Sequence, residues 1–160
     1  MRSFVTYSGP ENENSGSASQ VILVLDTTFL ILHYFSEDVT VTAKTREVLR
    51  SSRKLGNKGI VPTIVLAEFY AQTYKRAGRD VADKYFREIA NSGLQIVPLT
   101  QEISHEAGLL RSKYHERVPW GNCIVAATAL HSKAKFVLTE DPHFADVNEI
   151  ETRRTSEARV

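Results

Sequence analysis

Three acidic residues stand where a folded chain could use them for chemistry. Asp26 follows the apolar run 21–25, Asp141 comes two residues after the segment 135–139 with its apolar centre, and Glu68 lies beside the apolar stripe of a helical segment. Alone, each acid also fits a helix cap, a turn or an exposed side chain. Carboxylates that converge repel one another, and Mg²⁺ relieves the repulsion because it prefers oxygen ligands. Such a site can activate water, so these residues predict metal-assisted hydrolysis of a phosphodiester.

The elements that would position these acids alternate between strands and helices. Strands are expected at 21–25, 59–61, 94–99 and 135–139, with one more short strand in 149–160. Helices are expected at 29–35, 41–55, from 62 onward, and at 80–91, 101–114 and 123–132. This alternation is typical of parallel βαβ units. We therefore predict an α/β fold, a three-layer α/β/α sandwich with a central parallel sheet of four to five strands. Functional residues should gather at the carboxyl ends of those strands.

Length and composition set the domain organisation. The 160 residues are 42% hydrophobic and 24% charged, which predicts one globular domain. We expect a flexible leader at 1–19, one folded domain at 20–150 and a tail at 151–160. The single cysteine, Cys123, cannot form an internal disulfide, and no apolar run is long enough to cross a membrane. A cytoplasmic protein with no membrane partner is the resulting expectation.

Four segments, in this order and spacing, resemble the PIN domain family and within it the VapC-type toxins. They are VLDTT at 24–28, PTIVLAE at 62–68, IVAATAL at 124–130 and VLTEDPHF at 137–144. The resemblance implies a metal-dependent endoribonuclease of the toxin-antitoxin type, with Mg²⁺ or Mn²⁺ as cofactor and RNA as substrate. It also implies a homodimer and a cognate antitoxin protein as partner.

The family motifs assign roles to particular residues of this chain. Asp26, Glu68 and Asp141 match the first, second and fourth acids, and Thr27 and Thr139 match the hydroxyl residues beside them. These three acids and the residue at the third acidic position would form the catalytic and metal-binding set.

The third acidic position is occupied by Asn122 instead of aspartate. An asparagine offers one carbonyl oxygen and is a good helix N-cap, but it carries no charge and cannot act as a base. Three interpretations stay open: a naturally impaired PIN module, a substitution introduced to allow production of a toxic protein, or a site where three acids suffice with water or Glu116 in support. The alternative function is a non-catalytic PIN module that binds RNA or a protein partner.

Other residues carry weaker signals. The net charge of +1 neither demands nor forbids a nucleic-acid partner, although basic residues crowd positions 44–58. Lys54 and Arg111 are candidates for holding an RNA backbone. Trp120 and Tyr114 could stack on a base, but core or interface packing is the expected role for both. The five histidines show no paired metal-ligand spacing.

Overall fold

The computed structural model describes residues 20–159, so the leader expected at 1–19 lies outside the described residues. Strands and helices alternate along most of this range, with three short 3₁₀ helices in its last third. The elements are β1 (Ile22–Leu25), α1 (Thr27–Phe35), α2 (Val39–Ser51), β2 (Lys58–Pro62), α3 (Thr63–Ala77), α4 (Arg79–Ala90), β3 (Gln95–Val97), α5 (Gln101–Tyr114), η1 (His115–Arg117), α6 (Trp120–His131), β4 (Phe136–Leu138), η2 (Pro142–Asp146), β5 (Thr152–Arg153) and η3 (Thr155–Glu157).

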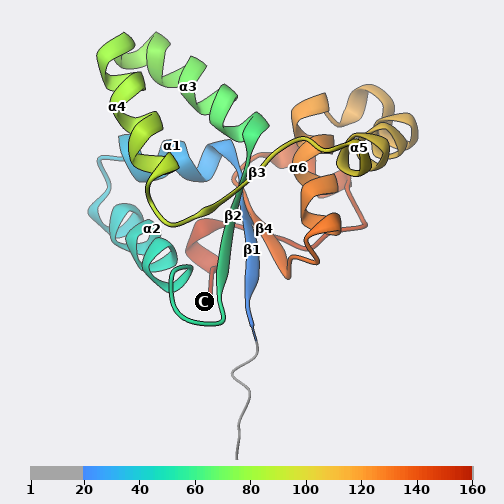
Figure 1. Cartoon of the computed structure of the whole chain (residues 1–160), viewed down its shortest axis with the longest axis horizontal. Coiled ribbons are helices and arrows are strands. Elements are labelled where there is room, and N and C mark those ends of the chain that lie inside the picture. The colour runs from blue at the N-terminus through green and yellow to red at the C-terminus, as the bar shows by residue number, and fades with distance from the viewer. Residues whose placement is uncertain (1–19, 160) are drawn as a thin grey trace, which may run out of the picture.

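The five strands form one parallel sheet in the order β3-β2-β1-β4-β5. β1 is central and β4 beside it is fully buried, which explains their unbroken apolar runs. In Figure 1, α1 and α2 lie on one side of the sheet and α5 and α6 on the other, while α3 and α4 pack together beyond the end of β2. The predicted α/β/α architecture is confirmed, with five strands.

Several helix boundaries differ from the prediction. α1 begins at Thr27 because the Asp26 carboxylate accepts a hydrogen bond from the Thr28 backbone N–H. α2 ends at Ser51, four residues earlier than expected. α6 begins at Trp120, three residues earlier than expected, with Pro119 at its N-cap. Asn122 therefore lies in the first turn of α6 and is not its N-cap.

The segment after residue 150 belongs to the sheet and to its surroundings. The backbone N–H groups of Val137 and Thr139 donate to the carbonyls of Glu151 and Arg153, at 2.9 and 3.1 Å. Ala158, beyond η3, is almost fully buried. No helix within 20–159 is long and apolar enough to cross a membrane.

Candidate active site

Asp26 sits at the carboxyl end of the central strand and is only 5% exposed. Its Oδ2 atom accepts hydrogen bonds from the hydroxyls of Thr28 and Thr139, at 2.9 and 2.8 Å. No lysine, arginine or histidine among the described residues forms an ion pair with it. Hydroxyl donors thus orient a buried carboxylate whose charge no cationic side chain offsets.

Glu68 reaches the same end of the sheet from α3. Its Oε2 atom accepts a 2.6 Å hydrogen bond from the Thr27 hydroxyl, next to Asp26. On its other side the carboxylate lies against the first turn of α6, because a Cβ added at Gly121 would clash with Glu68 Oε1. Gly121 therefore leaves the space that the Glu68 carboxylate occupies.

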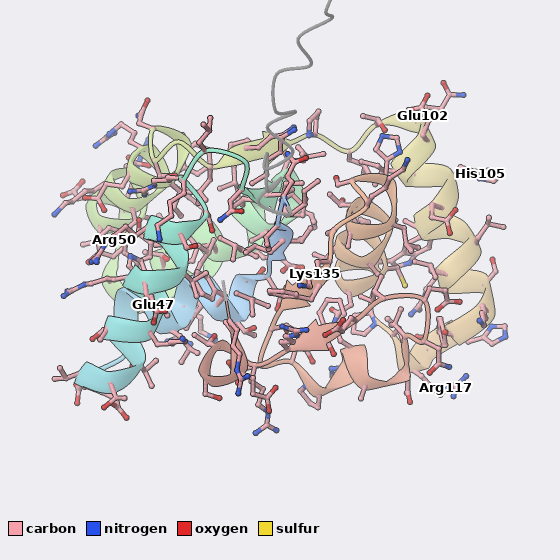
Figure 2. The ribbon with its side chains drawn as sticks, turned by 90° about the horizontal axis from the view of Figure 1, so that it is seen from below. Glu47, Arg50, Glu102, His105, Arg117 and Lys135 are labelled. Carbon is pink, nitrogen blue, oxygen red and sulfur yellow. The ribbon has the colours of Figure 1, made fainter. Side chains whose placement is uncertain are left out.

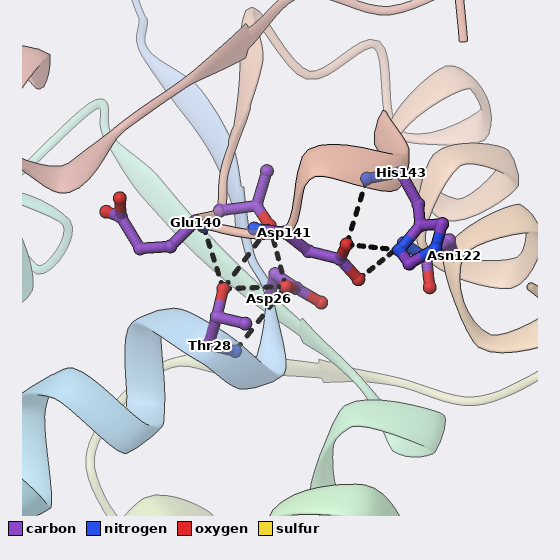
Figure 3. Close-up of polar contacts among 7 residues, drawn as sticks. Asp26, Thr28, Asn122, Glu140, Asp141 and His143 are labelled. Carbon is purple, nitrogen blue, oxygen red and sulfur yellow. Dashed lines mark hydrogen bonds and ion pairs between the residues drawn. The ribbon is translucent and has the colours of Figure 1, made fainter. Parts of the chain in front are cut away.

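Asp141 and Asn122 are joined directly. The Asn122 side-chain amide donates to Asp141 Oδ2 at 2.9 Å, and the backbone N–H of His143 donates to Oδ1 at 2.9 Å (Figure 3). The His143 ring nitrogen Nδ1 lies 2.7 Å from the same Oδ1. Burial acts to raise the pKa of Asp141, but the hydrogen bonds from Asn122 and His143 outweigh it and hold the pKa below its usual value.

These residues surround one cavity of about 370 Å³, lined by Asp26, Thr27, Thr28, Glu68, Ala71, Gln72, Asn122 and Asp141. The polar side chains that line the cavity are carboxylates, hydroxyls and two amides, and all of them can offer an oxygen atom to a metal ion. Oxygen ligands suit Mg²⁺ or Mn²⁺. Within 20–159, no three acidic, histidine or cysteine side chains lie close enough to share one ion. Mg²⁺ is usually held by one or two carboxylates and several waters, so the cavity fits such an ion without a three-acid cluster.

Two polar residues that line this cavity, Thr28 and Gln72, were not among the predicted site residues. Thr28 donates its hydroxyl to Asp26 and accepts the Glu140 backbone N–H at 2.9 Å, which ties α1 to the loop after β4. Gln72 follows Glu68 by four residues on α3, and this spacing places both on one face of the helix. That periodicity was the available signal for Gln72.

Other candidate residues lie elsewhere or are already engaged. Glu116 does not line the cavity and pairs with Arg111 at 2.9 Å, so it does not substitute for a fourth acid there. Arg111 also donates to the carbonyls of His115 and Val118. Tyr114 is buried and donates its hydroxyl to Glu149, as expected for a core residue, whereas Trp120 is 55% exposed.

None of the basic residues at positions 44–58 lines the cavity. Lys54 lies in the turn between α2 and β2, at the amino end of the strands. Figure 2, which views the molecule from below, shows Arg50 and Lys135 on this opposite side. The amino-end location of Lys135 agrees with its backbone N–H donating to the Ile22 carbonyl at the start of β1.

The sequence profile of the PIN domain family matches residues 23–150. No curated protein sequence matches the chain closely enough to count as a relative.

Solved structures with the same fold include VapBC toxin-antitoxin proteins. VapBC2 from Rickettsia felis, bound to a DNA fragment from its promoter, aligns with a TM-score of 0.68 at 18% identity, covering 84% of this chain and 98% of that one. VapC20 from Mycobacterium tuberculosis, a toxin that cleaves the sarcin-ricin loop, aligns with a TM-score of 0.66 at 16% identity, covering 82% and 98%. VapBC-1 from nontypeable Haemophilus influenzae aligns with a TM-score of 0.68 at 13% identity, covering 86% and 100%.

Proposed function

This chain belongs to the PIN domain family, and from that premise we propose that it is a VapC-like toxin, a metal-dependent endoribonuclease that hydrolyses RNA phosphodiesters. The observation that carries the proposal is the convergence of Asp26, Glu68 and Asp141 on one cavity at the carboxyl ends of the strands. The similar structures include a toxin that cleaves the sarcin-ricin loop, which supports RNA as the substrate class.

Asp26, Glu68, Asp141 and the Asn122 carbonyl oxygen would form the set that holds the Mg²⁺ or Mn²⁺ ion, one or two of the carboxylates directly and the others through bound waters. When bound, the ion supplies positive charge to the phosphate and makes a water molecule easier to deprotonate. The chain contributes orientation: Thr28 and Thr139 fix Asp26, and Thr27 fixes Glu68. Asn122 can orient a water or phosphate oxygen, but it cannot take up a proton at neutral pH.

A second candidate function is a non-catalytic PIN module that binds RNA or a protein. The observation in its favour is the 2.9 Å hydrogen bond between Asn122 and Asp141. Two carboxylates at this separation would repel and would favour a cation between them, whereas an amide and a carboxylate attract each other without one.

The test is RNA cleavage with Mn²⁺ or Mg²⁺ by three proteins: the chain as it stands, Asn122→Asp, and Asn122→Asp combined with Asp26→Asn. We expect cleavage to appear or rise in Asn122→Asp, because the variant regains the third acid. It should vanish in the double variant, because the carboxylate at the end of β1 is lost.

Cleavage that persists in the double variant would point to a contaminating nuclease or a different site. Absence of cleavage by all three proteins across varied RNA pools, with RNA binding intact, would favour the non-catalytic module.

A cognate antitoxin is part of the proposal, since several of the similar structures are toxin-antitoxin complexes. Homodimerisation stays a prediction from the family resemblance. Co-purification with the product of a small neighbouring gene that encodes a DNA-binding protein would support the toxin assignment.

A further inference from the structure

Trp120 is an exposed aromatic residue that does not itself line the acidic cavity but immediately precedes residues that contact its acids. It is the first residue of α6, directly before Gly121, which lies against Glu68, and two residues before Asn122, which binds Asp141. It is also the only tryptophan of the chain. A ring of this size that stays 55% exposed leaves apolar surface available for a ligand.

One side of this ring is supported by a residue that is itself held in place. The Arg111 guanidinium lies 5.6 Å from the centre of the Trp120 ring. Its nitrogens donate to the carbonyls of His115 and Val118, at 2.5 and 2.7 Å, and pair with Glu116 at 2.9 Å. The Arg111 side chain is therefore fixed before any ligand arrives, and the cation–π contact orients the indole.

We propose that Trp120 is a base-stacking residue, which receives one unpaired base of a single-stranded RNA and so positions the neighbouring phosphate at the acidic cavity. This inference rests on the proposed function, because it takes RNA as the ligand. Every base has an apolar face that stacks on an aromatic ring, whereas the faces of bases inside a duplex are already covered. The platform would thus select single-stranded segments with little regard to sequence.

Other aromatic residues do not offer the same combination. Tyr114 is buried, with its hydroxyl bonded to Glu149. Tyr74 is 52% exposed but lies six residues, about 9 Å of helix, beyond Glu68 along α3. Tyr74 therefore serves as the matched control, an aromatic residue of similar exposure away from the acids.

Because Trp120 is the only tryptophan, its intrinsic fluorescence reports directly on stacking. The full chain is titrated in EDTA, which prevents metal-dependent cleavage, with three probes: a 12-nucleotide single-stranded RNA, the same strand with abasic central positions, and its duplex. We expect the single strand to quench the emission and the abasic strand and duplex to quench it much less.

Binding is measured in parallel by the fluorescence anisotropy of a labelled single strand. Trp120→Ala should weaken binding by about 5- to 150-fold, the range that loss of one stacked base produces. Trp120→Phe should weaken it less, and Tyr74→Ala should leave it unchanged. Circular dichroism of each variant checks that the fold is retained.

The outcomes separate this inference from the proposed function. RNA that binds without quenching Trp120, and with equal affinity for Trp120→Ala, would overturn the stacking role and leave the ribonuclease proposal standing. Emission that shifts with protein concentration alone, together with loss of self-association in Trp120→Ala, would identify a protein contact and would also overturn it. Failure of both the native chain and Asn122→Asp to bind or cleave RNA would refute both.

Discussion

A single hydrogen bond, from the Asn122 side-chain amide to Asp141, stabilises the Asp141 carboxylate when no cation is bound. Asn122→Asp would place two carboxylates within about 3 Å of each other and remove the donor that Asp141 now has. We expect the metal-free variant to unfold with a free energy about 1–3 kcal/mol lower than the native chain. Added Mn²⁺ should raise its melting temperature by more than it raises that of the native chain.

Thermal unfolding in EDTA and in Mn²⁺ measures both quantities. Asn122→Ala is the control, since it loses the hydrogen bond without adding charge and should gain less from Mn²⁺. Equal metal responses of Asn122→Asp and the native chain would argue against a cation site at Asp141.

Two helices, α3 and α6, meet at the cavity through Gly121 and Glu68, and this contact can be tested with paired glycine substitutions. Gly108→Ala, in α5, meets no atom within 4 Å and should stabilise the chain by about 0.5–1 kcal/mol, because alanine favours helix. Gly121→Ala should lack this gain, because its Cβ displaces the Glu68 carboxylate and costs the 2.6 Å bond to Thr27.

Chemical denaturation of the single and double variants supplies the comparison. In a Glu68→Ala background, where the displaced carboxylate is gone, Gly121→Ala should regain stability. If Gly121→Ala stabilises the native background as much as Gly108→Ala does, α3 and α6 are not in the close contact described above.

The stability of the whole molecule should depend on pH through His33, which lies in α1 and contacts Thr45 of α2. Burial, and then the charges of Arg46 and Arg53, lower the pKa of His33 below its usual 6.5, and Glu88 opposes this only in part. Its Nδ1 atom lies 2.9 Å from the Thr45 hydroxyl, which itself donates to the Thr42 carbonyl. The unfolded chain therefore binds a proton more readily than the folded chain, and the free energy of unfolding should fall as the pH drops below 6.5.

Denaturation between pH 7.5 and 5.0 tests this dependence. The fall should be smaller in His33→Gln, whose amide can still donate to Thr45 but does not titrate in this range. Asp141 and Glu149, whose pKa values lie below their usual 3.8 and 4.5, contribute only at lower pH. An equal fall in both proteins would assign the pH dependence to other groups.

The sequence predicted the fold and the locations of Asp26 and Asp141 because these depend on short-range patterns, whereas Glu68, in the middle of a helix, was assigned to the site by the family motif. Unbroken apolar runs mark buried parallel strands, and an acid directly after such a run must lie at the carboxyl edge of the sheet. The start of α6 was misplaced because Trp120 and Gly121 carry no helix signal of their own. The hydrogen bonds that Arg111 donates could not be predicted from the sequence. Their acceptors are the backbone carbonyls of His115 and Val118, which come together only in the folded loop.

The last residues described also support the cavity, since the Thr155 backbone N–H donates to Glu140 Oε1 at 2.9 Å, next to Asp141. During synthesis, Asp26 and Glu68 leave the ribosome long before this segment exists. The nascent chain must therefore extend past residue 155, and that residue must clear the exit tunnel, before all the acids have their neighbours. A ribosome-bound intermediate in which residue 155 is still inside the tunnel would accordingly lack this support beside Asp141.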